Sequence, residues 1–411
     1  MASASKERPV ARVRSAAGVV VAAALLLGAC GRSTDVLPTT GTGGTTMPVT
    51  TFPAGSPADY TRYSVPGPYK AGTVQYLVHG DRVQVWYPVA PAAVPSGARP
   101  YTYHLRSWLP PAVQKIIPAS LDDTVTEDAY ANLPVAAGTF PVVLFSHGVG
   151  GYPEQSSFLT AHLATWGFVV VAPDQTRRDL TAVILQKKHS GGNTVDDART
   201  RAKDVSQMTG ALAFVEYQSA EAATLLSGHV NGNEVGTLGH SSGGYTAIAT
   251  AEADASIKTA VALAGDAIKP PTRSLPILLM SGSFDKLVPT AGVQRGYDQL
   301  LSPKAFVIVN RAGHNVFDDV CTIARREGGI AAAARSLKLP VPPGLLRLAL
   351  DGCRAPDIYP PKAFGLIDQS VTAELLYGLG VNKTPIGLGP GIENAFPGVT
   401  AIYQGNPPTA G

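Results

Sequence analysis

A serine between two glycines follows a short apolar run near the middle of the chain. Val235–Leu238 is long enough for a buried strand, and Gly239-His240-Ser241-Ser242-Gly243 leads from it into an alanine-rich, helix-like segment. A serine on a sharp turn from strand to helix exposes its hydroxyl, and flanking glycines let the two elements approach closely. Only Ser241 has both glycines, because Ser242 would need one at position 240. The pattern predicts that Ser241 is a nucleophile.

An aspartate and a histidine follow two later strand-like runs, in an order that a serine nucleophile can use. Pro276–Ser281 leads to Asp285, and Lys304–Asn310 leads to His314. His314 would accept the proton of Ser241 and return it to the leaving group, while Asp285 would hold the imidazole in the required tautomer. Of the 8 histidines, only His314 follows both the serine and the acid at a strand end.

The acid has a second candidate. Asp266 follows the strand-like run Thr259–Ala264, which comes directly after the helix expected behind the nucleophile. Asp285 is preferred because its Gly-x-x-Asp context lies on the later strand, and Asp266 stays open as the alternative.

The glycine-rich loop after Pro141–Ser146 is the expected source of an oxyanion-hole donor. Acyl transfer needs two backbone N–H groups aimed at the developing negative oxygen. Ser242, directly after the nucleophile, should supply one. The loop reads His147-Gly148-Val149-Gly150-Gly151, and its glycines allow a close approach to the site. Val149 N–H, with Gly148 as its neighbour, is the expected second donor; a plain turn is the alternative.

Alternating strand-like and helix-like segments must position these residues. Thr73–His79 and Val83–Pro88 are typical of an antiparallel hairpin, and Phe168–Pro173 is a continuous apolar run of the kind found in buried parallel strands. Strands and helices alternate from Pro141 onward. This predicts an α/β protein with a mostly parallel eight-stranded sheet flanked by helices. A hydrophobic content of 45% with 15% charged residues fits a large core.

Several of these segments together resemble the α/β-hydrolase family. They are PVVLFSHGVGG, FVVVAPD, VGTLGHSSGGYTA, LPILLMSGSFDKLVP and AGHNVFDD, with PGPY and VWYP nearer the N-terminus, over about residues 60–320. They are most similar to the branch with platelet-activating-factor acetylhydrolases, dienelactone-hydrolase-like proteins and cutinase-like lipases. In the acetylhydrolases the acid lies one strand earlier, which keeps Asp266 open. Dienelactone hydrolases use a cysteine, so Ser241 argues against their chemistry.

The chain departs from this pattern after His314. Residues 317–366 predict a helical insertion ahead of a last helix, Gln369–Leu379. The insertion either packs beside the mouth of the active site or is a structural addition at the side of the domain. The tail beyond Asn382 is rich in glycine and proline and is expected to be irregular.

The first 29 residues predict a lipoprotein signal peptide. Basic residues precede the apolar run Ala16–Leu27, which is short for a membrane span, and Leu27-Gly28-Ala29-Cys30 resembles a bacterial lipobox. Cys30 would then carry the lipid and anchor an exported protein to the cell membrane; an ordinary secretory signal is the alternative. Residues 30–58, rich in Thr, Gly and Pro, predict a disordered tether before a domain at 59–411.

The net charge limits the classes of binding partner, and the cysteine count bears on a disulfide. Cleavage after Ala29 would remove four basic and one acidic side chain, which lowers the net charge from +3 to about zero and argues against nucleic acid. With Cys30 in the anchor, Cys321 and Cys353 predict a disulfide, worth about 3–4 kcal/mol by loop entropy; two free thiols are the alternative. No cofactor or metal is expected. The pairs Asp122-Asp123 and Asp318-Asp319 could contact calcium, but solvated acidic pairs are commoner.

These observations predict a lipid-anchored serine hydrolase that cleaves carboxylic esters, of lipid or short acyl type, through an acyl-enzyme on Ser241. An acyltransferase with the same triad is one alternative, since it differs only in how water is excluded. A non-catalytic envelope lipoprotein that kept the fold as a binding module is another. The sequence sets neither the acyl chain length nor the oligomeric state.

Overall fold

A computed structural model describes residues 56–115, 124–185, 198–265, 271–325 and 343–406. The chain divides into two units, 1–43 and 44–411, and every described residue belongs to the second. η1 (Pro57–Thr61) begins two residues before the predicted start of the domain at residue 59. Within the described residues, no helix has both the length and the apolar character needed to cross a membrane.

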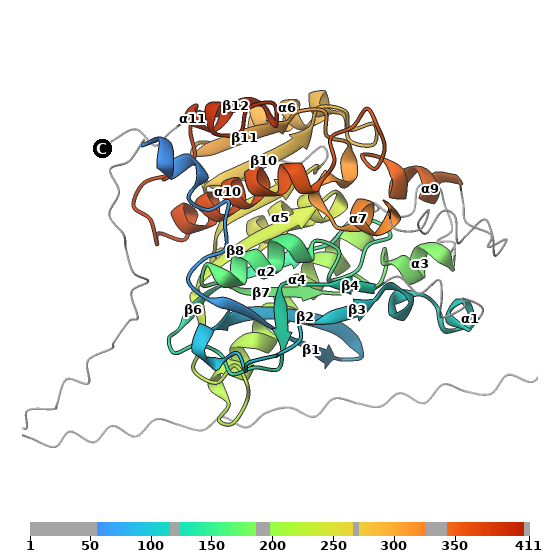
Figure 1. Cartoon of the computed structure of the whole chain (residues 1–411), viewed down its shortest axis with the longest axis vertical. Helices are drawn as coiled ribbons and strands as arrows, with labels where there is room; N and C mark the ends of the chain where they lie inside the picture. The colour runs from blue at the N-terminus through green and yellow to red at the C-terminus, as the bar shows by residue number, and fades with distance from the viewer. Residues whose placement is uncertain (1–55, 116–123, 186–197, 266–270, 326–342, 407–411) are drawn as a thin grey trace, which may run out of the picture. The chain divides into compact units, whose positions relative to one another are not determined.

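The described residues contain one large sheet of ten strands, in the order β12-β11-β10-β9-β8-β6-β7-β2-β1-β5, and a small sheet of β3 and β4 (Figure 1). The six strands from β7 to β11 in this order are parallel to one another. At the two ends of this group, β2 pairs with β7 and β12 pairs with β11, both in antiparallel fashion. The strands are β1 (Lys70–Val78), β2 (Asp81–Val89), β3 (Thr102–His104), β4 (Thr124–Thr126), β5 (Ala129–Ala131), β6 (Phe140–Ser146), β7 (Val169–Pro173), β8 (Val230–His240), β9 (Ile257–Leu263), β10 (Ile277–Gly282), β11 (Lys304–Val309) and β12 (Thr400–Asn406).

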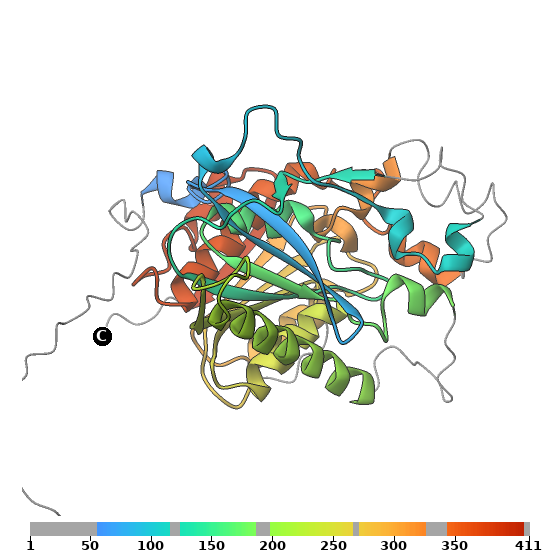
Figure 2. The same ribbon diagram turned by 90° about the horizontal axis from the view of Figure 1, so that it is seen from below.

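Helices cover both faces of the large sheet. α2 and α10 pack on one face, and α4, α5 and α6 pack on the other (Figure 2). The α-helices are α1 (Pro111–Gln114), α2 (Ser157–Thr165), α3 (Leu180–Ile184), α4 (Ala198–Ala220), α5 (Ser242–Ala253), α6 (Thr290–Gln299), α7 (Val320–Arg325), α9 (Pro343–Leu350), α10 (Pro361–Gly378) and α11 (Gly391–Ala395). Besides η1, the 3-10 helices are η2 (Pro91–Ala93), η3 (Leu105–Trp108) and η5 (His314–Phe317).

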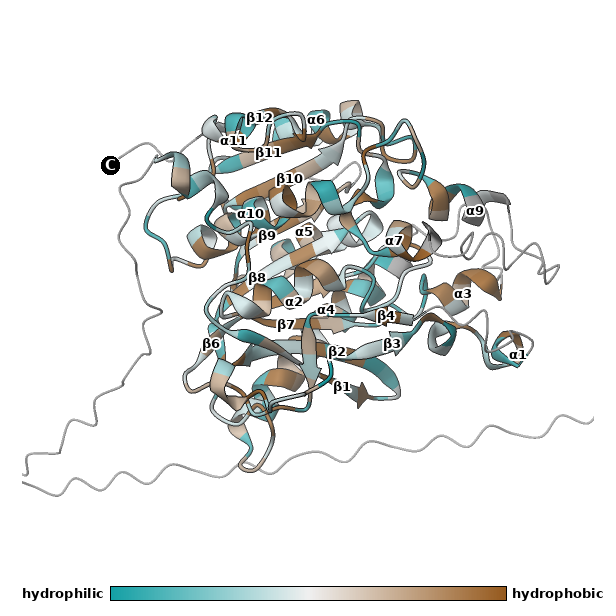
Figure 3. Cartoon of the chain, in the orientation of Figure 1, coloured by the Kyte–Doolittle hydropathy of each residue, from teal (hydrophilic) through white to brown (hydrophobic). Residues whose placement is uncertain are grey.

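The core lies in two layers, one on each side of the sheet. Successive side chains of a strand point to opposite faces. Leu278 and Met280 of β10 therefore pack with α10, while Ile277 and Leu279 pack on the α5 and α6 side. Both sets are fully or almost fully buried, and apolar residues run along the central strands in Figure 3. A strand covered on both faces must be apolar throughout, which is why these runs could be recognised in the sequence.

The expected fold class is confirmed, with two corrections. All eight expected strands are present, but the sheet also contains β5 and β12, one at each edge. The tail beyond Asn382 is not irregular throughout, because α11 and β12 form there and β12 pairs with β11 from Lys304 to Val309. The irregular expectation rested on the glycines and prolines of this tail, and these lie mainly between the elements rather than in β12.

Candidate active site

Ser241 lies at the turn between β8 and α5 in a strained backbone conformation. Its φ of 57° and ψ of −125° are rare for a residue with a side chain, and such strain is typical of functional turns. A Cβ on Gly239 would overlap the carbonyl of Gly243, so the crossing of strand and helix requires glycine there. The Ser241 N–H donates to the carbonyl of Leu263 at 2.8 Å, which ties the turn to β9. The Ser241 hydroxyl makes no capping hydrogen bond to α5.

Asp285 and His314 are hydrogen-bonded to each other. The distance from His314 Nδ1 to Asp285 Oδ2 is 2.8 Å, and both side chains are almost completely buried. Asp285 Oδ1 accepts from the backbone N–H groups of Leu287 at 2.8 Å and Val288 at 2.7 Å. The carboxylate is therefore fixed from both sides. His314 Nε2 is buried and has no hydrogen-bond partner among the described residues, which leaves it available to a hydroxyl.

The strand ends bring the nucleophile turn and the histidine loop together. His240 directly precedes Ser241, and its ring centroid is 4.8 Å from that of His314. The loop after β6 also reaches this point, since a Cβ on Gly148 would stand 3.1 Å from Cβ of Ser241. A Cβ at position 148 would make a tight contact with the nucleophile turn, so this close approach favours glycine.

The amides of the loop after β6 differ in what they bind. Gly148 N–H donates to Gln155 Oε1 at 3.0 Å, Gly150 N–H to the carbonyl of Arg178 at 2.7 Å, and Gly151 N–H to the carbonyl of Gly148 at 3.2 Å. Val149 N–H makes no hydrogen bond within the described part of the protein. Among the amides of Gly148, Val149, Gly150 and Gly151, it is the one left without a hydrogen-bond partner there.

The buried side chain of Arg178 holds the start of the loop after β6. Its guanidinium is fully buried, pairs with Asp204 at 2.6 Å, and donates to Ser146 Oγ at 2.8 Å and to the carbonyl of His147. A buried charge is stable only when it is paired and hydrogen-bonded, and these contacts meet that requirement. These contacts restrain the start of the loop that carries Val149.

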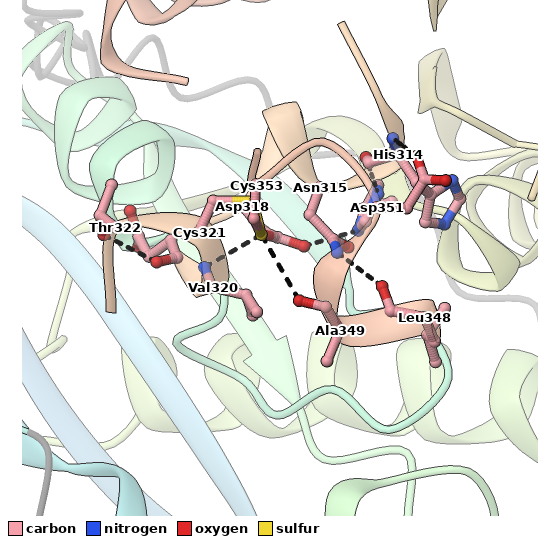
Figure 4. The surroundings of a disulfide bond; sticks show 12 residues. His314, Asn315, Asp318, Val320, Cys321, Thr322, Leu348, Ala349, Asp351 and Cys353 are labelled. Carbon is pink, nitrogen blue, oxygen red and sulfur yellow. Dashed lines mark hydrogen bonds and ion pairs between the residues drawn. A yellow bond between two sulfur atoms is a disulfide. The ribbon is translucent and has the colours of Figure 1, made fainter. Parts of the chain in front are cut away.

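The insertion after His314 packs against the backbone of the histidine loop. Asp351 follows α9 and accepts from His314 N–H through Oδ1 at 2.7 Å, while its carbonyl accepts from Asn315 N–H at 3.1 Å (Figure 4). The predicted disulfide is confirmed: Cys321 of α7 is bonded to Cys353, across 32 residues of sequence. Of the two placements left open for the insertion, the described residues favour the one beside the active site.

The acidic pair Asp318-Asp319 is not solvated, and this expectation was wrong. Both residues are at most 5% exposed. Asp319 Oδ2 accepts from Ser157 N–H and Oγ at 2.7 Å, and Asp318 Oδ1 accepts from Val320 N–H at 3.0 Å. Burial raises the pKa of Asp319 to about 6. The pair therefore links α2 and α7, and the described residues contain no cluster of three or more ligands suited to a metal ion.

A cavity of about 370 Å³ is lined by residues of α2, α7, α10 and the segment 124–128. Asp319, Glu127, His162 and Asp368 line it, but Ser241 and the other triad candidates do not. It is therefore a space separate from the candidate active site.

Four residues named in the sequence predictions fall outside the described residues. They are the alternative acid Asp266, the lipidation site Cys30 and the pair Asp122-Asp123. The others, Ser241, Ser242, Asp285, His314 and Val149, all lie in loops or helix starts at the carboxyl ends of β6, β8, β10 and β11.

Four residues of the site were not identified from the sequence as parts of it. Gln155, Arg178 and Asp351 act on it through partners distant in the chain, and no local pattern marks such contacts. His240 lies within the serine motif, but the motif does not show that its ring contacts Gln155 and the carbonyl of His314.

Comparisons with known proteins agree with this fold. The chlorophyllase family model matches residues 112–275. The structure of a ferulic acid esterase from Streptomyces cinnamoneus superposes with a TM-score of 0.54 and 20% sequence identity, over 78% of this chain and 93% of that one. This likeness and the order of the strands show that the chain has an α/β-hydrolase fold.

Proposed function

We propose that this α/β-hydrolase cleaves carboxylic esters through a covalent acyl-enzyme on Ser241. The observation that carries the proposal is the 2.8 Å hydrogen bond from His314 to Asp285 beside the strained serine turn. A serine hydroxyl is a weak nucleophile until a neighbouring base removes its proton, and this pair provides the base and its orienting acid.

In the proposed first half-reaction, Ser241 Oγ attacks the ester carbonyl carbon as His314 Nε2 takes the hydroxyl proton. Asp285 holds the proton on Nδ1 and stabilises the imidazolium that forms. The N–H groups of Val149 and Ser242 donate to the carbonyl oxygen as it becomes negative. The C–O bond to the alcohol then breaks, and the alcohol leaves with the proton from His314.

In the second half-reaction, water attacks the acyl-enzyme. His314 removes a proton from the water, the tetrahedral intermediate forms at the same donors, and the carboxylic acid leaves as Ser241 recovers its proton. The nucleophile, base, acid and oxyanion donors of both half-reactions are residues of the chain, and the attacking water comes from solvent.

The substrate class within this reaction is proposed to be esters of lipid or short acyl type. The support is a near-neutral chain after removal of the predicted signal, with no strongly charged balance that would favour highly charged substrates. A chain-length series of p-nitrophenyl esters, assayed with and without an alcohol acceptor, measures the acyl preference. Acyl transfer to the acceptor in preference to water would replace the hydrolase proposal by the acyltransferase alternative.

Ser241→Ala tests the central proposal. Turnover of short p-nitrophenyl esters should fall by at least about 10³-fold, because the nucleophile is lost while the fold is kept. A fluorophosphonate should label the unaltered protein at Ser241 and leave the variant unlabelled. Ser242→Ala is the matched control, since it keeps the backbone N–H and removes only the neighbouring hydroxyl. A folded, unlabelled wild-type protein would favour a binding module instead.

We also propose that the protein is exported and anchored to the cell membrane by lipid on Cys30. The support is the basic and apolar N-terminus followed by the lipobox-like sequence. Metabolic palmitate labelling should be lost in Cys30→Ala, and labelling that persists in this variant would contradict the anchor.

A further inference from the structure

Three hydrogen bonds connect the loops that carry the oxyanion donor, the nucleophile and the base. Gly148 N–H donates to Gln155 Oε1 at 3.0 Å. Gln155 Nε2 and His240 Nδ1 are 2.9 Å apart, and His240 Nε2 lies 3.1 Å from the carbonyl oxygen of His314. Gln155 lies between the loop after β6 and α2, far in sequence from His240, so only the folded structure forms this chain of hydrogen bonds.

The direction of each hydrogen bond follows from the two backbone groups at the ends of this chain of hydrogen bonds, Gly148 N–H and the carbonyl of His314. The carbonyl of His314 can only accept, so His240 Nε2 must carry the hydrogen. In a neutral imidazole the other nitrogen is then an acceptor, and it takes a hydrogen from the amide NH₂ of Gln155. Gln155 Oε1 remains free to accept from Gly148 N–H. A single arrangement therefore satisfies all the groups.

The surroundings keep His240 in this neutral form. His240 is 2% exposed, and burial lowers its pKa well below the ordinary value, with His314 and Arg178 acting in the same direction. Asp318 Oδ2 lies 3.6 Å from His240 Nδ1, but burial raises the pKa of this carboxyl well above its usual range. A neutral His240 also avoids a second positive charge beside His314 when that ring takes up the serine proton.

Steric packing fixes the amide of Gln155 in place. A Cβ on Gly151 would overlap Gln155 Oε1, so glycine at 151 leaves the space the amide occupies. The backbone carbonyl of Gln155 accepts from Asp319 N–H at 2.7 Å, which fixes the backbone at this residue. With Gly148 N–H already bound to Gln155, the next amide, that of Val149, is the one left for substrate.

We propose that Gln155 and His240 are positioning residues, which together hold the Val149 amide and the His314 loop in register with Ser241. The inference rests on the proposed ester hydrolysis and adds two residues to its machinery. Neither side chain needs to touch substrate. Their effect is on the rate of the chemical step, because small displacements of an oxyanion donor or a base weaken the transition state more than the bound substrate.

Gln155→Met tests this by keeping the length of the side chain and removing both hydrogen bonds. We expect kcat for p-nitrophenyl acetate to fall about 30-fold with KM changed less than about threefold. Gln369→Met is the matched control, because Gln369 is fully buried, makes three hydrogen bonds and lies in α10 away from the triad. It should lower Tm but leave kcat within about twofold. Equal losses of kcat in both variants would overturn the proposal.

His240→Phe and the double variant test whether the two residues act as one unit. The double variant should lose little more kcat than either single variant, since breaking one link already disconnects the chain. Losses that multiply would show that the residues act independently and would contradict the inference.

A spectroscopic measurement keeps the test independent of activity. In ¹⁵N-labelled Ser241→Ala protein, the His240 ring should be neutral with its proton on Nε2 from pH 5 to 8, and Gln155→Met should shift the Nδ1 resonance. A charged ring or a proton on Nδ1 would overturn the hydrogen-bond chain. If the wild-type protein failed to hydrolyse any ester while His240 showed the expected tautomer, the proposed function would fail and the geometry would stand.

Discussion

Asp285 determines the direction in which the His314 ring can act. Both of its carboxylate oxygens are used, one by His314 Nδ1 and the other by the amides of Leu287 and Val288. A carboxylate held in this way keeps the proton on Nδ1 and leaves Nε2 as the base. An amide in its place would keep the shape but could favour the wrong tautomer.

Asp285→Asn should therefore lower kcat for p-nitrophenyl esters by about 10³–10⁴-fold, with little change in Tm. Asp266→Asn is the comparison, because Asp266 was the alternative acid in the sequence. It should stay within about threefold of wild type. A fully active Asp285→Asn enzyme together with an inactive Asp266→Asn enzyme would reverse the assignment.

The placement of the candidate site could be predicted at this scale, because its residues follow strand ends in a fixed chain order. Their catalytic roles stay predictions. Ser241, Asp285 and His314 each come directly after an apolar run that the sequence displays. Gln155 gave no such signal, because its contact with His240 joins residues 85 positions apart. Arg178 follows another arginine, and only burial distinguishes the two.

At the scale of elements, the insertion after His314 holds the backbone of the proposed catalytic histidine. α9 leads to Asp351, whose carboxylate and carbonyl accept from the N–H groups of His314 and Asn315. Asn315 Nδ2 also donates to the carbonyl of Leu348 at 2.6 Å. The bond between Cys321 and Cys353 fixes the end of this element two residues after Asp351.

Asp351→Ala should remove one of these supports. The buried N–H of His314 loses its partner, so kcat should fall about tenfold and the free energy of unfolding by about 1–3 kcal/mol. Asp351→Asn keeps an oxygen that can accept this N–H and is the control. Both quantities are measured by ester kinetics and urea unfolding, and equal defects in the two variants would argue against the hydrogen bond as the cause.

The elements that sequence reasoning found and missed differ in how they are stabilised. The inner strands are covered on both faces, so their apolar runs are visible in the sequence. β5 has three residues, and β12 contains glycine and polar residues. Each of these two strands forms by pairing with a neighbouring strand. The residues of β5 and β12 alone therefore do not predict a strand.

At the scale of the whole molecule, several buried acids make stability depend on pH. Burial raises the pKa of Glu374 from 4.5 to about 8, and one of its oxygens lacks a partner among the described residues. The folded state thus favours the protonated acid. The stabilising contribution of protonated Glu374 to the free energy of unfolding is fully present below about pH 4.5 and is lost as the pH rises through about 8. Glu154 has a pKa raised to about 8 by the same cause.

Glu374→Gln should therefore stabilise the protein increasingly as the pH rises. The gain follows from the difference between the folded and unfolded pKa and is about 1 kcal/mol at pH 5 and about 3 kcal/mol at pH 7. Urea unfolding at both pH values measures it. Glu221→Gln, at an exposed position, should show no such gain. A constant difference between Glu374→Gln and wild type across this range would contradict buried ionisation as the cause.

The covalent link between Cys321 and Cys353 has a practical consequence for handling the protein. A protease that cuts once anywhere in the intervening backbone would leave two fragments still joined, and such a nicked sample would migrate as one species until a reductant is added. Purity judged without reduction would therefore overlook a cut between the two cysteines, and loss of activity in an apparently intact preparation should first be checked on a reducing gel.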